Sequence, residues 1–374
     1  MATDRHLRDF FADLPDPRVT GRCTHDLTDI VLIVLCGTLS GADDFVSIAE
    51  FAEAKEGWLR DRLGLTLANG VPSHDTLNRV FAALRPDAFH DAFLAWVAVA
   101  ADRLKVKQIA VDGKALRGSR AGACPALCIV SAWATDAGLT LAQARTADQS
   151  NEIAAIPELL DLLDVAGALV SIDAAGCQKE IAGQVVRGKG DYLLAVKENQ
   201  PRLYEDIDRL ALAAMEADYA GLSRHLAEGP GHGRDEMRFC FVLTDLSEIR
   251  DRALWAGLRS VVCVVRCRTV NGKEAHETHY YISSRAGSAK AFQAAVRRHW
   301  GIENGCHWVL DVAFREDVHR LRDGHAPENL ALVRKMALAM LKKAPAKIGI
   351  KNKRLKAGWD HTFLETALRD FLDD

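Results

Sequence analysis

The sequence predicts an α+β protein of several domains, and three features along the chain lead to that prediction. Residues 1–105 carry only helical patterns. Between residues 106 and 219, short apolar strands follow one another and then alternate with helices. Residues 220–286 are rich in strand-like runs, and residues 287–374 return to helical patterns. We therefore expect a helical N-terminal domain, a mixed α/β core, a β-rich insertion, and a C-terminal part that completes the core.

Composition sets the broad class of the protein. The chain has 374 residues, 49% of them hydrophobic and 26% charged, which is ordinary for a globular protein of two or three domains. The longest apolar run near the N-terminus, Ile30–Cys36, is far shorter than the ~20 residues of a membrane helix. The first residues contain no apolar signal region, so we expect a cytoplasmic protein with no membrane partner. The nine cysteines lack the spacing of a disulfide framework or zinc site and are interpreted as reduced thiols.

The N-terminal region is predicted to contain four helices. Leu27–Leu39 is apolar enough to be buried, and Ala42–Lys55 is amphipathic. Ser73 is a credible N-cap for the periodic run that follows it to Leu84, and Pro86–Leu104 makes a further helix. A short capped helix in a small helical domain is compatible with a helix-turn-helix DNA reader. A bundle that only packs on the next domain is the alternative.

The core pattern changes from helix to strand at residue 107. The expected elements, in order, are strands Gln108–Asp112, Ala126–Ala134 and Leu139–Arg145, helix Asn151–Leu163 with Ser150 as its cap, strand Ala168–Asp173, helix Ala175–Val186, strand Asp191–Val196 and helix Gln200–Glu216. The turn Thr135–Gly138 is typical of a hairpin. Three antiparallel strands followed by parallel additions is the order of an RNase H-like sheet, in which the first and fourth strands are neighbours.

The remaining elements are a β-rich insertion and a helical end. Strand-like runs occur at Glu236–Leu243, Ser260–Arg266 and His279–Ile282, and Gly229–Gly233 is interpreted as a loop. The stretch Ala294–Asp317 is predicted to be helical, with Ile302, Val309 and Leu310 facing a core. The later elements are a helix at Pro327–Lys343, a basic loop at Lys342–Lys356 that lies on nucleic acid or solvent, and a short helix at Trp359–Leu372.

Three acidic residues stand out against this layout. Asp112 and Asp173 end the first and fourth strands, and Glu303 lies within the helix Ala294–Asp317, between His299 and His307. We expect the three carboxylates to converge and to bind two Mg²⁺ ions, with Mn²⁺ as a substitute, because hard divalent ions prefer oxygen ligands. Two such ions can activate a water and stabilise a leaving oxygen in phosphodiester cleavage.

Basic residues accompany these acids and predict a polyanion partner. Residues 297–356 contain 14 Lys and Arg against 6 Asp and Glu, although the whole chain has a net charge of −3. A solvated charged surface is the alternative to nucleic-acid binding for any one of them. Taken as a set at the strand ends, the predicted contacts with double-stranded DNA are Lys114, Arg117, Lys197, Arg297, Arg298, His299, Trp300, Lys353 and Arg354.

Two side-chain patterns on the glutamate helix allow other interpretations. His299, Glu303 and His307 have the four-residue spacing of a transition-metal site, but the HExxH zinc signature is absent, so magnesium is favoured. Trp300 and Trp308 each follow a histidine. We expect Trp308 to lie in the core, while Trp300 is open to stacking on an unpaired base.

Several long motifs resemble one family. DGKALRGS, SNEIAAIPELL, SIDAAGCQKEIA, DYLLAVKENQ and HWGIEN…HWVLDVAFRED are similar to motifs of bacterial insertion-sequence transposases of the DDE class, nearest to the As-one branch of H-repeat-associated proteins. The resemblance implies an RNase H-like catalytic core and Mg²⁺-dependent DNA cleavage and strand transfer. It also implies that Asp112, Asp173 and Glu303 are the metal-binding acids.

The resemblance implies a reaction mechanism, but this sequence differs from the wider relatives around the third acid. Water attacks the phosphate at an element end, and the freed 3′-OH then attacks target DNA, so a homodimer on paired ends is expected. The wider relatives carry a Tyr, Arg, Glu, Lys signature, whose positions here hold Val296, His299 and Leu310 around Glu303; Arg298 and Arg315 are candidates for the missing charge. The rival functions are a nuclease or resolvase that does not join, an inactive DNA-binding transposase, and an actin-like ATPase, for which no duplicated Gly-rich loop is found.

Overall fold

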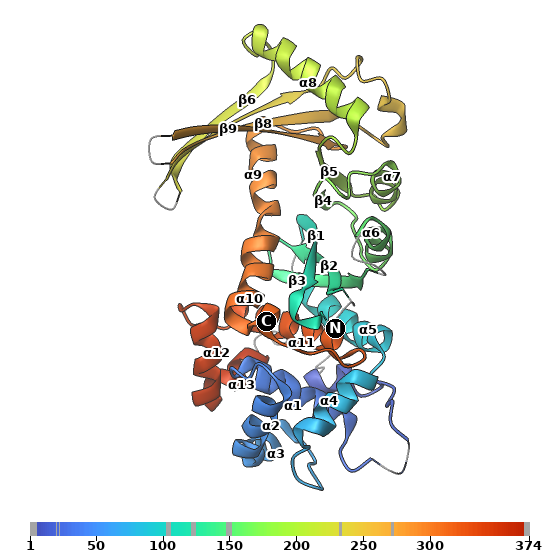
Figure 1. Cartoon of the computed structure of the whole chain (residues 1–374), viewed down its shortest axis with the longest axis vertical. Helices are drawn as coiled ribbons and strands as arrows, with labels where there is room; N and C mark the ends of the chain where they lie inside the picture. Colours follow the sequence, from blue (N-terminus) through green and yellow to red (C-terminus); the bar gives the residue numbers. More distant parts are fainter. Residues whose placement is uncertain are drawn as a thin grey trace.

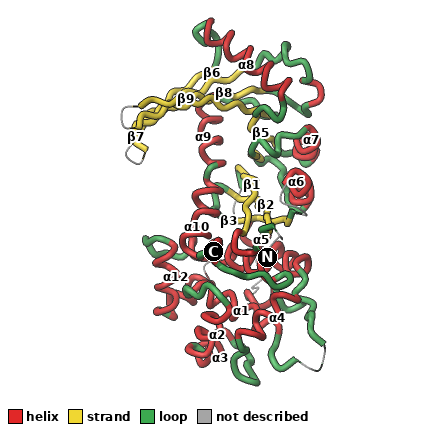
Figure 2. The backbone as a smooth tube through the Cα atoms, in the orientation of Figure 1, coloured by secondary structure: helices red, strands yellow, loops and turns green. Residues whose placement is uncertain are grey.

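The computed structural model describes residues 6–19, 21, 23–101, 106–120, 125–146, 152–231, 234–270 and 273–369 (Figures 1 and 2). Its N-terminal region is helical, and the helices are α1 (Leu27–Leu39), α2 (Phe45–Ala54), α3 (Glu56–Leu63), α4 (His74–Ala83) and α5 (Pro86–Ala101), after a short 3₁₀ turn η1 (Leu7–Phe10). The predicted cap is confirmed, because the Ser73 hydroxyl accepts from the Thr76 amide. The predicted end of the last helix at Leu104 and the predicted cap Ser150 lie outside the described residues.

Helix α1 forms the centre of this helical region. All of its side chains are buried, as its sequence predicts, and Asp26 caps its first turn. The helix packs against α2 and against α11 (Ala326–Lys343), which comes from the C-terminal part of the chain. The N-terminal helices therefore share their core with the end of the chain.

A single mixed sheet of nine strands runs through the rest of the described chain. The strands are β1 (Gln108–Leu116), β2 (Leu127–Ala134), β3 (Leu139–Arg145), β4 (Leu169–Ile172), β5 (Asp191–Val196), β6 (Ser223–Gly231), β7 (Arg234–Leu243), β8 (Ser260–Val270) and β9 (Lys273–Ser283). Their order across the sheet is β3-β2-β1-β4-β5-β9-β8-β7-β6. This is a mixed α/β fold with a large sheet.

The first five strands have the order and directions that the sequence predicts. β1 pairs antiparallel with β2, β2 antiparallel with β3, and β1 parallel with β4, which is itself parallel to β5. Helices α6 (Glu152–Asp161) and α7 (Lys179–Arg187) connect the parallel strands, and both lie on the same side of the sheet in Figure 1. The predicted adjacency of the first and fourth strands is confirmed.

The β-rich segment extends this sheet. β9 pairs antiparallel with β5, and β8, β7 and β6 follow outward. Helix α8 (Pro201–Glu216) lies over these strands, at the top of Figure 1. The predicted loop at Gly229–Gly233 is wrong in its first part, since Gly229–Gly231 belong to β6, while residues 232 and 233 lie outside the described residues.

The predicted glutamate helix is interrupted. α9 (Ala289–His299) is followed by a π-helical segment (Glu303–His307) and by α10 (Trp308–Phe314). Ile302, Cys306 and Leu310 are fully buried along it, so the extra residue of the π turn leaves the buried face intact. Single-turn π segments inside helices occur most often at functional sites.

The predicted basic loop at the C-terminus is wrong. Its second half, from Ile350 on, forms the start of helix α12 (Ile350–Trp359), which is followed by α13 (His361–Arg369). α12 packs on α1, α10 and α11, so the C-terminal helices close the helical region in the lower half of Figure 1. No helix among the described residues is long and apolar enough to cross a membrane.

Candidate active site

Two of the predicted acids are placed side by side by the parallel ladder. The last paired residues of β1 and β4 are Val111 and Ile172, so Asp112 and Asp173 come next on adjacent strands. Neighbouring strands are about 4.8 Å apart, and residues in register face the same side of a sheet. Asp173 also accepts hydrogen bonds from the amides of Ala175 and Gly176, at 3.1 and 3.3 Å, which fix the turn after β4.

The glutamate segment is fixed against the same two strands. His299 Nδ1 lies 3.1 Å from Ser171 Oγ on β4, and the Gln108 amide of β1 donates to Ser171 Oγ at 3.1 Å. The Arg298 guanidinium donates to Gln108 Oε1 at 2.9 Å. These bonds anchor the end of α9, and the π segment that follows places Glu303 and His307 toward the acids.

His307 directly contacts one of the acids. Its Nδ1 lies 3.4 Å from Asp112 Oδ2, and its Nε2 is buried without a hydrogen-bond partner among the described residues. The His307 side chain is 11% exposed. Burying a ring nitrogen without a hydrogen-bond partner lowers the stability of the fold. Packing alone therefore does not explain a histidine at this position.

The charges of Asp112 and Asp173 act on both Glu303 and His299. The pKa of Glu303 is raised, first by burial and then by the charge of Asp112, with Asp173 adding and His307 opposing. Burial lowers the pKa of His299, against the opposing effect of Asp112 and Asp173. Mutual repulsion among carboxylates of this kind is relieved by a bound cation.

A fourth carboxylate, Glu152, belongs to this cluster, and the sequence analysis did not select it. Burial raises its pKa, and the charges of Asp173 and Asp112 add to that effect, while the Cys128 thiol donates to its Oε1 at 3.4 Å. The carboxylate occupies the space where a Cβ on Gly113 would lie, so it sits against the backbone next to Asp112. The available signal was the motif SNEIAAIPELL, which contains Glu152 as its only glutamate before the proline.

The four carboxylates do not form a compact three-ligand site. Within the described residues, no three of them bring ligand oxygens within 4.8 Å of one another. Carboxylate oxygens are ligands that suit hard divalent ions. The one group of three that meets the 4.8 Å limit is Cys267, Glu274 and His276 on the β8–β9 hairpin, so His299, Glu303 and His307 do not form a compact transition-metal site.

Lys114 was predicted to contact phosphate, and the structure contradicts that role. Its ammonium lies 2.5 Å from Asp311, 2.7 Å from Glu316 and 3.4 Å from Asp317. Although burial alone would lower it, these carboxylates raise the pKa of Lys114. Lys114 therefore joins β1 to the end of α10, and Asp311 and Glu316 are neutralised there, which makes them poor alternatives to Glu303.

Lys353 and Arg354 are also wrong as DNA contacts, because both are buried in α12. The Lys353 ammonium donates to the carbonyls of Leu341 and Ala344. The Arg354 guanidinium donates to the carbonyls of Thr38, Ala42 and Ala313 and pairs with Asp43 at 2.8 Å. These cations donate hydrogen bonds to carbonyls at or just beyond the ends of helices and so stabilise the fold. A count of charges along the sequence does not distinguish such buried cations from exposed ones.

The other predicted contacts remain at the surface. Arg117, Lys197, Arg297 and Arg298 are exposed, and Trp300 is 45% exposed. Lys197 lines the same cavity as Asp173. His299 is only partly accessible because it faces β4. Trp308, predicted to be core, is 60% exposed, so that prediction is wrong.

Comparison with known proteins shows the family of this chain. The family described as DDE_Tnp_1-associated matches residues 8–97, and the family described as Transposase DDE domain matches residues 106–340. Two acids follow the point where the parallel pairing of β1 and β4 ends, and a third comes from a helical segment. Such oxygen ligands are of the kind that divalent-metal sites for phosphodiester chemistry use. The chain belongs to the DDE transposase family.

Relatives of similar length carry the same name. YncI of Escherichia coli O157:H7, named as a transposase, is 37% identical over 97% of this chain and 94% of its own length. YhhI of Escherichia coli K12, named as an H repeat-associated transposase, is 34% identical over 97% of this chain and 98% of its own. A piggyBac transposase synaptic complex with hairpin DNA aligns over 98% of this chain and 77% of that one, with a TM-score of 0.40 and 10% identity.

Proposed function

We propose that this transposase cuts the ends of an insertion sequence and joins the freed 3′-OH ends to target DNA at the carboxylates of Asp112, Asp173 and Glu303. The observation that carries the proposal is the parallel ladder ending at Val111 and Ile172, because it brings two acids together beside the anchored glutamate segment. The strand order β3-β2-β1-β4-β5 supports an RNase H-like core with β6–β9 as an insertion.

The four carboxylates, including Glu152, would hold the divalent ions, and Mg²⁺ or Mn²⁺ fits their oxygen ligands. Bound ions supply an activated water or 3′-OH and stabilise the leaving oxygen. The chain's own residues bind and orient. His307 holds the Asp112 carboxylate at 3.4 Å, and Lys197, exposed in the cavity beside Asp173, is placed to contact a phosphate.

The proposed partners are double-stranded DNA at the element ends and the target. Two ends must be cut and joined together, so we propose a homodimer on paired ends, which works on the bacterial nucleoid in the cytoplasm. Helix α4 exposes His74, Asp75 and Arg79 and remains a candidate DNA contact of the helical region.

The test uses the full-length protein and a labelled duplex bearing the element end. Wild type is expected to cut only with Mg²⁺ or Mn²⁺ and to join a pre-cut end, while Asp112→Asn and Glu303→Gln lose both reactions and keep DNA affinity. Normal cleavage by either variant contradicts the assignment. Cutting without joining identifies a nuclease, and DNA binding without cutting by wild type identifies a protein that only binds DNA.

A further inference from the structure

We propose that a groove beside the carboxylates binds the phosphate backbone of the DNA being cut, a few base pairs from the scissile phosphate. The groove is lined by Arg117, Arg120, Arg320 and Arg322, and we call it the arginine groove. This inference rests on the function proposed above and adds to it the path of the DNA.

Two segments that pack backbone to backbone form the floor of the arginine groove. One is the 3₁₀ turn η2 (Arg117–Ser119) after β1, and the other is η5 (Glu316–Val318) after α10. A Cβ on Gly118 would overlap the His319 carbonyl, so only glycine allows this close approach. The arginines therefore extend from a closely packed base.

The charges in the groove are largely uncompensated. Among the described residues, no ion pair or side-chain hydrogen bond is found for Arg120, Arg320 or Arg322, and all three are exposed. Arg117 has only Asp317, at 3.5 Å, and that carboxylate already faces Lys114. Four exposed arginines line this groove with one carboxylate, Asp317. Such an excess of positive charge is an electrostatic site for a polyanion.

The rest of the basic tract behaves differently. Arg334, Lys335 and Arg354 are each 5% exposed or less, and they bond to groups inside the protein. Some of the Lys and Arg residues after residue 297 are thus buried and stabilise the fold, while others are exposed. The arginines of the arginine groove are exposed.

The position of the groove selects DNA over an acidic protein. β1 carries Asp112 and leads into Arg117, while the segment that carries Glu303 leads through α10 into the other wall. The four steps of strand from Asp112 to Leu116 span about 14 Å at ~3.4 Å per residue, and Arg117 comes one residue further. One DNA strand advances about 3.4 Å per nucleotide along the axis, so the arginines fall roughly four to five nucleotides from the cleavage point.

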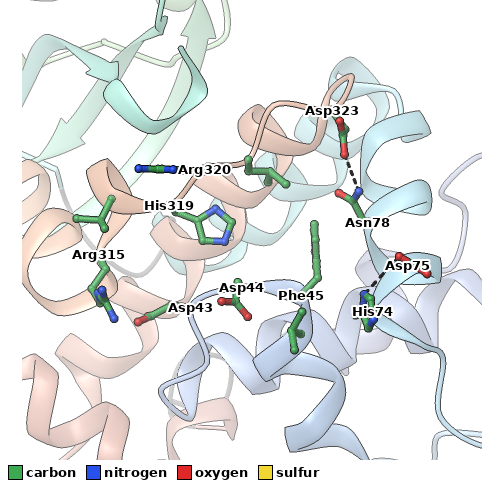
Figure 3. Close-up of a pocket in the computed structure, with 13 residues that line it drawn as sticks. Asp43, Asp44, Phe45, His74, Asp75, Asn78, Arg315, His319, Arg320 and Asp323 are labelled. Carbon is green, nitrogen blue, oxygen red and sulfur yellow. Dashed lines mark hydrogen bonds and ion pairs between the residues drawn. The ribbon is translucent and has the colours of Figure 1, made fainter. Parts of the chain in front are cut away.

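The second wall is held by the helical region. Figure 3 shows His319 above Asp44, in a pocket that Arg315, Arg320 and residues of α4 also line. In the same view Asn78 donates to Asp323 at 2.7 Å, and the His325 amide donates to the Ala82 carbonyl. Arg320 and Arg322 therefore stand on an anchored segment, which lowers the entropic cost of ordering them on a phosphate backbone.

The test compares two variants that lose equal charge. Arg320→Gln with Arg322→Gln removes half of the groove cations. Arg187→Gln with Lys189→Gln removes two exposed cations at the opposite ends of the parallel strands. Arg187 is the last residue of α7, and Lys189 lies between α7 and β5. The affinity for a short duplex bearing the element end is measured against salt concentration. The groove pair is expected to lower the slope of log Kd against log salt by about 1.8, at ~0.9 per lost phosphate contact, and the control pair leaves it unchanged.

A second measurement locates the contact. Uncharged methylphosphonate linkages are placed one at a time along each strand. Those roughly four to five nucleotides from the cleavage point are expected to weaken binding by wild type and the control pair, but not by the groove pair. An unchanged salt slope, equal effects of both pairs, or interference that persists in the groove pair overturns the proposal and leaves an acidic protein as the occupant.

The two proposals fail separately. Thermal unfolding and circular dichroism verify that both variants fold, which is expected because the substituted side chains are exposed. If wild type binds duplex with the predicted slope but never cuts it with Mg²⁺, the proposed catalytic function fails while the groove stands. If wild type cuts normally and the groove pair binds and cuts as wild type does at all salt concentrations, the groove assignment fails alone.

Discussion

Glu152 shows how a single side chain completes a site built by residues far away in the sequence. It begins α6, yet its carboxylate lies against Gly113 and feels the charges of Asp112 and Asp173. Asp112 and Asp173 are predicted because each follows an apolar strand. No comparable sequence pattern selects an acidic residue at the start of a helix. Sequence patterns select Asp112, Asp173 and Glu303 as candidates, whereas the position of Glu152 depends on how α6 packs on the sheet.

We expect Glu152→Gln to weaken divalent-ion binding while leaving the fold intact. The change keeps the shape of the side chain and removes one negative charge from a cluster that shares ions. Mn²⁺ affinity, measured by titration calorimetry without DNA, is expected to fall by roughly tenfold or more, and cleavage needs correspondingly more Mg²⁺.

Glu158→Gln is the matched control, because Glu158 is exposed on the same helix and has no ion pair among the described residues. Equal Mn²⁺ affinity in wild type and Glu152→Gln, with a normal Mg²⁺ requirement, would remove Glu152 from the site.

At the scale of elements, α12 is held by a buried cation. Arg354 joins three helices through the carbonyls of Thr38, Ala42 and Ala313, and it lies 4.3 Å from the centre of the Phe314 ring. Burial lowers the pKa of Arg354, while Asp43 raises it. A guanidinium offers five N–H donors in a rigid planar fork, which suits several fixed acceptors at once.

We expect Arg354→Met to lower the free energy of unfolding by about 3–5 kcal/mol, because it leaves Asp43 and several carbonyls without their donor. Urea denaturation of the full chain measures this loss. Lys351→Met on the exposed side of α12 is the control and is expected to change stability by less than about 0.5 kcal/mol. A loss for Arg354→Met no larger than that of the control would contradict the role given to this residue.

The elements that sequence patterns located best are those whose burial is local. The boundaries of α1, β3 and β5 are the same as predicted, since a continuous apolar run or an alternating one defines each. The π segment was not predicted, because Ile302, Cys306 and Leu310 keep the four-residue spacing of a regular helix. α12 was missed because its buried face is formed by Lys353, Arg354 and Ala357, which look like solvent-exposed residues in the sequence.

The whole molecule is held together where the helical region meets the sheet. His90 on α5 accepts a hydrogen bond from the Gln143 amide of β3 through Nε2, at 3.2 Å. His319, after α10, faces Asp43 and Asp44 beside Arg334 (Figure 3). Burial first, and then a nearby cation, lowers the pKa of each imidazole to about 4; the cation is Lys335 for His90 and Arg334 for His319. Both interface histidines are therefore neutral in the folded protein.

A pH dependence of stability follows from these two groups. In the unfolded chain a histidine titrates near pH 6.5, so between about pH 6.5 and 4 the unfolded state binds more protons than the folded state. Their contribution to stability is complete above about pH 6.5, falls as the pH is lowered toward 4, and falls no further below that. We expect the urea midpoint of the full chain to decline across this window.

The variant His90→Gln tests the assignment. Glutamine keeps an acceptor for the Gln143 amide and cannot take up a proton, so it is expected to make the decline between about pH 6.5 and 4 shallower. His361→Gln is the control, because His361 lies at the surface near Trp58 and Lys55. A urea midpoint that falls equally steeply in wild type and His90→Gln would show that the junction between α5 and β3 is not the acid-sensitive part of the molecule.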